Sequence, residues 1–332
     1  MTKKRKVAVI GSNSFSGSDF IDLLLEDPIN QVIGISRSPE KSVLFLPYKA
    51  HVNPDFKFYQ LDLNQNINSI IALLDEFRPE YIVNFAAQSE VAPSWENPGQ
   101  WFQTNAVALA NLANALKNKN YFKKYVHISS PEVYGTCEGL IMEDAILNPS
   151  TPYAASKAAG DLFLLTLVKN FDFPLVIIRS TNVYGAHQQL FKIIPRSIIY
   201  FKSGKTIQLH GGGNAIKSYI HIRDVSRGEF AAMIAGNPGE TYHISPDKGH
   251  SVKEIVKQIC SLLKKDFKKS TESVEERQGQ DAAYIINSSK ARQQFSWNPS
   301  LDLKEGLSST IAWIEKNWED IQNEALEYIH KP

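Results

Sequence analysis

Tyr153 and Lys157, four residues apart in TPYAASKAAGD, are well spaced for acid–base chemistry. On a helix, residues i and i+4 lie one turn apart on the same face. A lysine ammonium beside a phenol lowers the pKa of the phenol. A phenolate poised near neutral pH can take the proton of a hydroxyl group while the same carbon gives a hydride to nicotinamide. Two exposed residues on a helix can have the same spacing without any function. This pair, however, follows a strand that ends in Ser129-Ser130, and that position favours a catalytic site.

That strand end, VHISSPEVYG, contains the step Ser130-Pro131-Glu132 and therefore one carboxylate. Proline has no acidic proton, fixes φ at about −65° and restricts the residue before it. Glu132 is then the one group of this step that can move a proton to or from carbon. The alternative is a turn residue whose carboxylate bonds loop amides.

The loop VIGSNSFSG, after the first predicted strand, fits a dinucleotide site. Gly11 would permit the tight turn and Gly17 the close approach of helix and strand, while helix N-terminal amides hold a pyrophosphate. Ser14 departs from the usual pattern, because its side chain crowds the phosphates unless its hydroxyl bonds one. We expect Phe15 and Ser16 to line the cofactor as well. An ordinary strand-turn-helix loop is the alternative.

Arg37 stands at the end of the second predicted strand, where NAD-preferring sites usually carry an acidic residue. A carboxylate would repel a 2′-phosphate, whereas an arginine pairs with one. We therefore favour NADP as the cofactor, with NAD possible; a surface arginine that touches no ligand is the alternative. Asp62 ends the third strand and could accept a hydrogen bond from the adenine amino group, or could cap a helix.

Short β-rich runs alternate with helical patterns along the first 180 residues, which predicts an α/β fold with a doubly wound parallel Rossmann sheet. Later segments are shorter and richer in Gly, Pro and charge, which predicts a smaller C-terminal α/β substrate-binding lobe. The dinucleotide domain would comprise residues 1–180 plus about 222–246, and the lobe 181–221 and 247–332. Helices are expected over 16–27, 67–77, 99–118 and 152–171, and strands over 6–11, 31–36, 57–63, 80–87, 123–130 and 174–180.

Composition excludes several classes of protein. The chain has 332 residues, of which 43% are hydrophobic, and a formal net charge of +1, so no field gathers nucleic acid or an anionic membrane. No run approaches the roughly 18 apolar residues of a membrane span. Cys137 and Cys260 give neither a disulfide framework nor metal-ligand spacing, and we expect a cytoplasmic protein without a metal site.

Taken together, the motifs resemble those of the extended short-chain dehydrogenase/reductases that act on nucleotide sugars. The resemblance covers nearly the whole chain, and the order and spacing of its pieces are specific although each piece is weak. The pieces are GSNSFSG, NFAAQSEVAPSWENP, FQTN, HISSPEVYG, TPYAASK, RSTNVYG and ERQGQDAAYIINSSKARQQFSWNPSLDLKEGL.

The resemblance implies a role for each matching residue. Tyr153 would be the base, Lys157 its partner and a ribose ligand, and Ser130 the donor to the 4-oxygen of the sugar. Lys217 stands where the family has an arginine, so it keeps the charge but loses the bidentate fork. Further residues expected along the cofactor are Leu63, Ala86, Ala87 and Gln88. Those expected along the substrate, a nucleotide-diphosphate sugar, are Ser89, Ser94, Asn105, Asn182, Lys217 and Arg277.

Glu132 favours a 4,6-dehydratase within this family. In the dTDP-glucose type the strand end reads Thr-Asp-Glu, and the aspartic acid protonates the departing 6-hydroxyl while the glutamate takes the proton of carbon 5. In the GDP-mannose type a serine replaces the aspartate, and water is still eliminated. The 4-epimerases generally have no carboxylate at this position, and they are the alternative. A UDP-glucuronate-type decarboxylase ranks third, and a non-catalytic NADP-binding regulatory protein is the alternative outside enzymes.

Assembly is the last expectation from the sequence. The helices at about 99–118 and 152–169 are apolar on more than one face, which calls for a second covering surface. In the family, two such helices pair with their mates in a four-helix bundle, so we expect a homodimer. Burial within one chain is the alternative for their apolar residues, which are Leu109, Leu112, Leu116, Leu162, Phe163, Leu165 and Leu167. The nucleotide base and the sugar are not specified by any motif.

Overall fold

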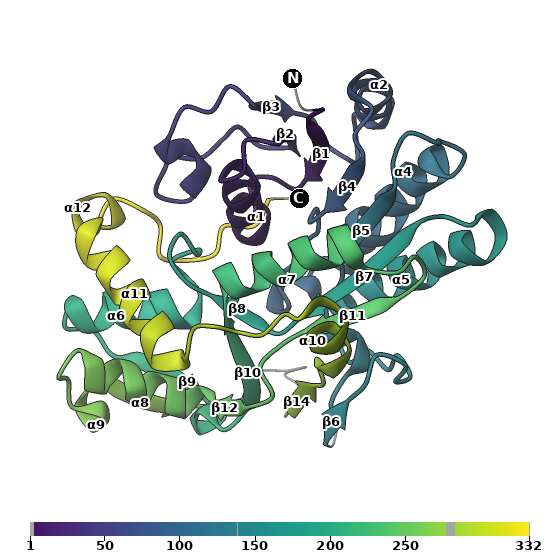
Figure 1. Ribbon diagram of the computed structural model, residues 1–332. Coiled ribbons are helices and arrows are strands. Elements are labelled where there is room, and N and C mark those ends of the chain that lie inside the picture. The colour runs from purple at the N-terminus through teal and green to yellow at the C-terminus, as the bar shows by residue number, and fades with distance from the viewer. Residues whose placement is uncertain (1–2, 138, 277–282, 332) are drawn as a thin grey trace.

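A seven-stranded parallel sheet forms the centre of the computed structural model, which describes residues 3–137, 139–276 and 283–331 (Figure 1). The strand order is β11-β7-β5-β4-β1-β2-β3, and every neighbouring pair is parallel. This arrangement confirms the predicted doubly wound Rossmann fold. The strands are β1 (Arg5–Ile10), β2 (Asn30–Ser36), β3 (Phe56–Gln60), β4 (Tyr81–Asn84), β5 (Lys124–Ile128), β7 (Leu175–Ser180) and β11 (Thr241–Ile244).

The inner strands are apolar in their middle because helices cover both faces of the sheet, whereas the edge strand β3 has no buried residue. In β1, Val7 and Val9 face one core and Ala8 and Ile10 the other, as the two-residue period of a strand requires. Residues of α1 (Phe15–Leu25) and α7 (Ile222–Ala235) complete the first core. The second core is completed by α2 (Ile67–Phe77), α4 (Leu109–Leu116) and α5 (Pro152–Phe171).

The helix predicted over residues 99–118 contains a π-helical turn. The turn, η3 (Gln103–Ala108), lies between α3 (Pro98–Phe102) and α4. Single π turns are frequent at functional sites. Opposite this turn stands Gly160 of α5, where an added Cβ atom would lie 2.6 Å from the carbonyl oxygen of Asn105. The glycine therefore lets α5 approach η3 closely.

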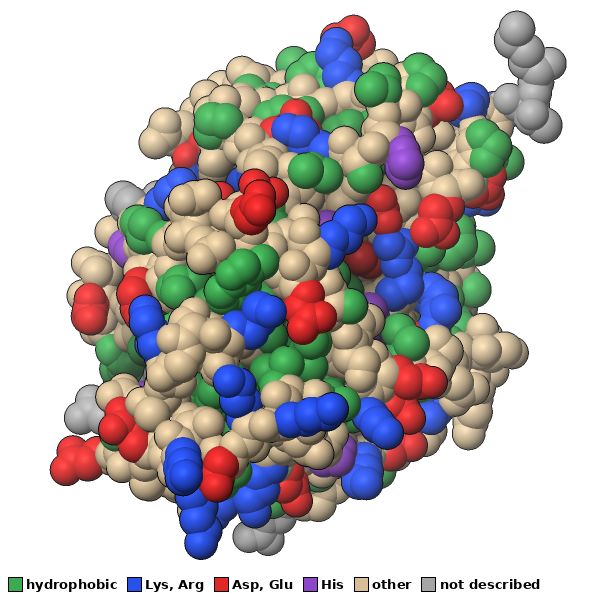
Figure 2. Space-filling model, turned by 90° about the vertical axis from the view of Figure 1, so that its left-hand side faces the viewer, with side chains coloured by type: hydrophobic (Ala, Val, Ile, Leu, Met, Phe, Trp, Pro, Cys, Tyr) green, Lys and Arg blue, Asp and Glu red, His purple; other side chains and the backbone are tan. Residues whose placement is uncertain are grey.

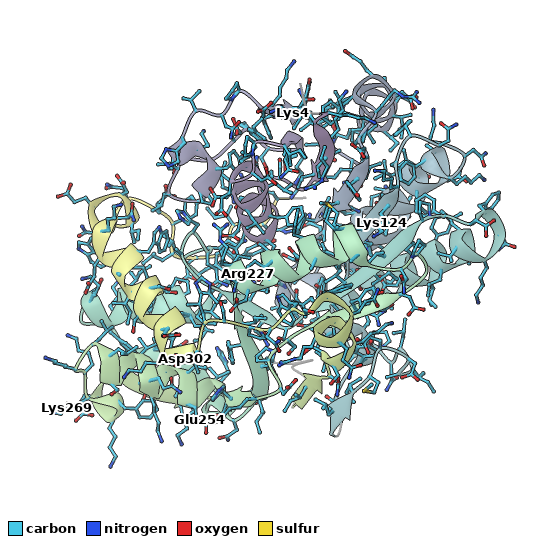
Figure 3. All side chains as sticks on the ribbon, viewed as in Figure 1. Lys4, Lys124, Arg227, Glu254, Lys269 and Asp302 are labelled. Carbon is cyan, nitrogen blue, oxygen red and sulfur yellow. The ribbon has the colours of Figure 1, made fainter. Side chains whose placement is uncertain are left out.

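The remaining elements build two smaller sheets and their helices. One sheet has the order β12-β10-β14-β6 with β8 beside β10, and β13 pairs with β9. In the same part of the chain, α8 (Val252–Leu262) and α11 (Leu303–Lys316) begin with capping boxes, to which Glu254 and Asp302 belong (Figure 3). The strands are β6 (Leu140–Ile141), β8 (Asn182–Tyr184), β9 (Ile207–His210), β10 (Ile216–His221), β12 (Gly249–Ser251), β13 (Thr271–Val274) and β14 (Ala283–Ile286). The helices are α6 (Ile193–Lys202), α8 (Val252–Leu262), α9 (Phe267–Ser270), α10 (Ser289–Phe295), α11 (Leu303–Lys316) and α12 (Trp318–Ile321), with short turns η1 (Pro47–Ala50), η2 (Ala92–Ser94), η4 (Pro131–Tyr134) and η5 (Gly211–Gly213).

β11 joins the central sheet beside β7, so the chain returns to the first sheet after building part of the second. The domain boundaries expected from the sequence stay a prediction. Figure 2 shows charges of both signs interspersed over one face of the molecule, with Lys and Arg side chains gathered toward its lower edge. Among the described residues, no helix is long and apolar enough to cross a membrane.

Replacing Gly160 by valine should destabilise the fold, because the new side chain would collide with the backbone of η3. We expect a loss of about 1–3 kcal/mol in the free energy of unfolding, the usual cost of overpacking. Gly99→Val is the matched control, since nothing lies within 4 Å of a Cβ atom built there. Urea unfolding of both variants measures the difference, and equal stabilities would show that η3 and α5 do not depend on this close approach.

Candidate active site

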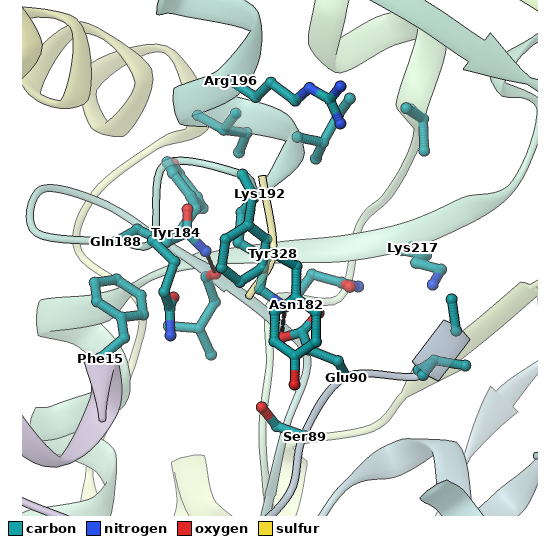
Figure 4. Close-up of a pocket in the computed structure, with 18 of the residues that line it drawn as sticks. Phe15, Ser89, Glu90, Asn182, Tyr184, Gln188, Lys192, Arg196, Lys217 and Tyr328 are labelled. Atoms are coloured by element: carbon teal, nitrogen blue, oxygen red, sulfur yellow. Dashed lines mark hydrogen bonds and ion pairs between the residues drawn. The ribbon is translucent and has the colours of Figure 1, made fainter. Parts of the chain in front are cut away.

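A cavity of about 1260 Å³ opens at the carboxyl ends of the central strands (Figure 4). Its walls come from the segments that follow β1, β4, β5 and β7, and from the second sheet and its connections. Ligands of open parallel sheets bind outside the carboxyl ends of the strands. The predicted residues that line this cavity are Ser14, Phe15, Ser16, Ala87, Ser89, Ser130, Glu132, Tyr153, Lys157, Asn182 and Lys217.

Tyr153 and Lys157 reach the cavity from the first turns of α5. Thr151 caps this helix by accepting a hydrogen bond from the amide of Ala154 at 3.1 Å. The amide of Tyr153 donates to Ser94 Oγ at 3.2 Å, and Lys157 Nζ donates to the carbonyl of Ile128 at 2.8 Å. Tyr153 is 9% exposed and Lys157 is 2% exposed. Both side chains are therefore largely buried where they line the cavity.

Burial dominates the ionisation of this pair. Burial lowers the pKa of Lys157 to about 8, although the charge of Asp161 opposes the change. Burial also raises the pKa of Tyr153, the charge of Glu132 raises it further, and only a hydrogen bond with Ser130 opposes them. The net direction for Tyr153 is therefore opposite to the lowering of its pKa that the spacing suggested. The physical reason is that the lysine ammonium is turned to the β5 carbonyl and the phenol lies among carboxylates.

A buried ion pair beneath the cavity fixes the end of β5. Asp161 is fully buried and accepts hydrogen bonds from Ser129 Oγ at 2.6 Å and Arg179 Nη2 at 2.7 Å. Burial raises the pKa of Asp161, but the hydrogen bond with His127 and the charge of Arg179 hold it below its ordinary value. Sequence reasoning missed this pair. The available signals were the position of Asp161 one turn after Lys157 and the lone charge of Arg179 in an apolar strand.

Pro131 is the first residue of η4, the short 3₁₀ turn that carries Glu132. The cap is Ser130, whose Oγ accepts from the amide of Glu132 at 3.2 Å. Proline suits the first helical position because that amide has no partner within the helix. Pro131 is buried and does not line the cavity, whereas Ser130 and Glu132 do. The turn thus directs residue 131 inward and residue 132 toward the cavity.

The loop after β1 has the shape that a dinucleotide pyrophosphate requires. Gly11 has a φ of +85°, and a Cβ atom there would lie 2.6 Å from the amide nitrogen of Ala86. A Cβ atom on Gly17 would lie 2.5 Å from the carbonyl oxygen of Gly11. Ser14 caps α1, since its Oγ accepts from the amide of Gly17 at 3.0 Å. The cap explains the unusual serine, and the open N-terminus of α1 beside the cavity fits an anionic cofactor.

The ends of β2, β3 and β4 place the other predicted cofactor residues. Arg37 Nη2 and Gln88 Nε2 both donate to the carbonyl oxygen of Lys331, at 2.8 and 2.9 Å. Asp62 accepts from the amide of Asn64 at 2.8 Å, which is a local turn bond, and it does not cap α2, whose N-cap is Asn66. Leu63 is 7% exposed beside it. Contacts of these residues with a cofactor stay a prediction.

Two predicted substrate residues position other groups and do not line the cavity. Asn105 is buried; its Oδ1 accepts from the amide of Gln88 at 2.8 Å, and its Nδ2 donates to the Gln88 carbonyl and to Ser156 Oγ at 2.9 Å. Ser94 is buried beneath the first turn of α5. Their hydrogen-bond partners lie far away in the sequence. The motif alone therefore did not show whether Asn105 and Ser94 bind substrate or position other residues.

The outer part of the cavity has charged and aromatic groups that the sequence did not identify. Lys192 pairs with Glu90 at 2.6 Å, and Figure 4 shows this pair beside Tyr328. Two predicted substrate residues lie there as well: Asn182 Nδ2 donates to the Ser218 carbonyl at 3.2 Å, and Lys217 lines the wall. The last predicted substrate residue, Arg277, lies outside the described residues.

Residues 9–310 match the family model described as GDP-mannose 4,6 dehydratase. The chain belongs to this family. It is 28% identical over 348 residues to a dTDP-glucose 4,6-dehydratase of Neisseria meningitidis, covering 96% of each chain. The match confirms the predicted resemblance to the extended short-chain dehydrogenase/reductases, and the chain is an enzyme of that type.

Solved structures agree with this assignment. A dTDP-glucose 4,6-dehydratase from Streptomyces venezuelae with NAD and TYD bound matches with a TM-score of 0.88 and 28% identity, over 95% of this chain and 98% of that one. A UDP-glucuronic acid 4-epimerase from Bacillus cereus in complex with UDP-glucuronic acid and NAD matches with a TM-score of 0.86 and 25% identity, over 94% and 99%. Both relatives hold NAD, so they do not support the predicted preference for NADP.

The position of Pro131 leads to a prediction about Pro131→Asp. An aspartic acid there would be buried away from the cavity, so it should not speed catalysis and should cost about 1–3 kcal/mol of unfolding free energy. Pro131→Ala, the control, loses only the restriction of the unfolded chain, at most about 1 kcal/mol. Urea unfolding and turnover test both variants. Faster elimination of water by the aspartate variant would mean that position 131 faces the substrate.

Proposed function

We propose that this enzyme is a nucleotide-sugar 4,6-dehydratase. The observation that carries the proposal is the shared cavity wall formed by Tyr153, Ser130 and Glu132. Oxidation at carbon 4 needs a base and a hydroxyl donor, and removal of the carbon 5 proton needs a further base. A 4-epimerase needs no base at carbon 5, so the carboxylate of Glu132 supports the dehydratase over the epimerase.

The residues toward the inner cavity fit a nicotinamide dinucleotide. Gly11, Gly17 and the N-terminus of α1 would hold its pyrophosphate, and Lys157 would bind the nicotinamide ribose. When bound, the dinucleotide takes a hydride from carbon 4 of the sugar and returns one to carbon 6. The 2′-phosphate of NADP would pair with Arg37, and NADP preference stays a proposal that rests on this one side chain.

Tyr153 would take the proton of the 4-hydroxyl as the first step. Ser130, which shares a hydrogen bond with Tyr153, would donate to the 4-oxygen of the sugar and hold it in place. A phenol whose pKa is raised by burial and by Glu132 is a poor base. Bringing the Lys157 ammonium toward the phenol would offset this. We therefore propose that ligand binding redirects Lys157 from the Ile128 carbonyl.

Glu132 would carry out both proton transfers of the elimination. The 4-keto group acidifies the carbon 5 hydrogen, which Glu132 removes as a proton. The same carboxyl group then gives that proton to the departing 6-hydroxyl, which leaves as water. Carbon 5 takes a new proton from solvent when a hydride is returned to carbon 6. No separate acid is needed at position 131, which agrees with the inward orientation of Pro131.

The outer cavity would hold the nucleotide diphosphate. Lys192, Arg196 and Lys217 line this part of the wall and supply positive charge. Lys192 and Arg196 pair with Glu90 and Glu327 at 2.6 and 3.2 Å, so an incoming diphosphate would compete for them. Contacts from Asn182 and Arg277 remain part of the proposal.

We also propose a homodimer through the outer face of α5 and η3. Four of the leucines expected there, Leu109, Leu112, Leu116 and Leu167, are buried within the single chain, so they give no support. The apolar residues that remain exposed on α3, η3 and α5 include Phe102 at 38%, Val107 at 47% and Leu162 at 56%. α5 packs against both α3 and η3, so these residues lie on adjoining elements.

Glu132→Gln should stop the elimination of water. An amide cannot take the carbon 5 proton, so turnover should fall by at least ~100-fold, while the affinity for the sugar nucleotide stays unchanged. Mass spectrometry of the products measures the loss of water. Tyr153→Phe is the comparison variant, since it should block the first step as well. Normal elimination of water by the glutamine variant would identify Glu132 as a turn residue, whereas a product of unchanged mass from the wild-type enzyme would make the 4-epimerase the better account.

Leu162→Glu should convert the proposed dimer into a monomer, because it places a charge in a desolvated helix interface. Light scattering at micromolar protein concentration measures the mass. The control is Ile146→Glu, which changes a side chain that is 87% exposed on a loop and should leave the mass unaltered. A monomeric mass for the wild-type protein would refute the dimer.

A further inference from the structure

The chain after α12 crosses the candidate active site as an extended strap, here defined as residues 324–331. Figure 1 shows it running from α12 to the region of α1 and β1. Glu327 and Tyr328 of the strap line the cavity. The strap therefore connects the outer, substrate end of the cavity with the ends of the central strands.

Specific side-chain contacts hold the strap in place. The ring of Tyr328 lies 5.4 Å from that of Phe191, and its hydroxyl bonds His330 Nδ1 at 3.0 Å. His330 stacks on Trp101, with ring centroids 5.2 Å apart and planes 9° from parallel. His330 Nε2 also bonds Gln100 Oε1 at 2.5 Å. His330 thus packs on helix α3, and Tyr328 packs on the cavity wall at Phe191.

The strap ends on two groups of the dinucleotide site. The carbonyl oxygen of Lys331 accepts from Arg37 Nη2 at 2.8 Å and from Gln88 Nε2 at 2.9 Å. Arg37 follows β2 and Gln88 follows β4, on either side of the Gly11 turn that follows β1. In a Rossmann sheet the adenosine ribose lies at the end of the second strand, beside this turn. The Lys331 carbonyl therefore accepts hydrogen bonds from two side chains, Arg37 and Gln88, that would face the adenosine end of the cofactor.

We propose that the strap is an internal competitor of the dinucleotide at its adenosine end. Arg37 and Gln88 cannot direct the same hydrogen bonds to Lys331 and to a ribose or phosphate, so cofactor entry releases residues 328–331. A site that is free in only a fraction of molecules binds with an apparent Kd raised by the inverse of that fraction. The proposal rests on the dinucleotide site of the proposed function but not on dehydration chemistry.

Removing the strap should tighten cofactor binding. The variant that ends at Glu327 retains Leu326, which packs against the hydrophobic core. It loses the contacts that the strap makes with Arg37, Gln88 and Trp101. We expect its Kd for NAD, measured by titration calorimetry, to fall by at least ~10-fold relative to the full chain. An unchanged or higher Kd would overturn the competition, and a higher value would identify the strap as a lid that holds the cofactor.

Point variants in the full chain test the same mechanism without truncation. His330→Ala removes the stack on Trp101 and the bond to Gln100, so it should also lower the Kd for NAD, by a smaller factor. Ile329→Ala is the matched control, because that side chain is 65% exposed and should leave the Kd unchanged. Equal Kd values for His330→Ala and the wild type would contradict the proposal. Absence of both NAD and NADP binding in every variant would instead overturn the dinucleotide site and the proposed function together.

Discussion

The buried contact between Asp161 and Arg179 is the constraint on which the active-site geometry depends. It joins α5, which carries Tyr153 and Lys157, to β7, and through Ser129 to the end of β5. Removing one partner of a buried ion pair leaves an uncompensated charge and typically costs about 3–5 kcal/mol. The pKa of the Asp161 carboxyl is held below its ordinary value, so its stabilising effect is present at neutral pH and is lost progressively in acid.

Sequence reasoning located the reactive groups because their signals are local. The i and i+4 spacing brings Tyr153 and Lys157 to the cavity, and the strand end brings Ser130 and Glu132 there. The sequence could not predict the direction in which the pKa of Tyr153 shifts, because burial among groups from other elements sets it. The alternating strands and helices likewise predicted the sheet, because the inner strands are buried on both faces.

Contacts between distant segments account for what the sequence did not give. Asn105 belongs to a motif expected to bind substrate, but it positions Gln88. It does so from a π turn that no local sequence pattern indicates. Arg37 bonds a carbonyl that is 294 residues away in the chain, so its role could not be inferred from its strand alone. The same limit applies to the apolar helix faces, since only the folded chain separates Leu112, which is buried, from Leu162, which is exposed.

The central claim is that Glu132 removes the carbon 5 proton in a dehydration. The direct measurement is incubation of the wild-type enzyme with nucleoside-diphosphate hexoses in heavy water, followed by mass spectrometry and NMR of the product. The account predicts a sugar that has lost one water and has gained one deuterium at carbon 5, since the original proton leaves with the water and carbon 5 takes its new one from the solvent. A product of unchanged mass, with no deuterium and an inverted carbon 4, would contradict it.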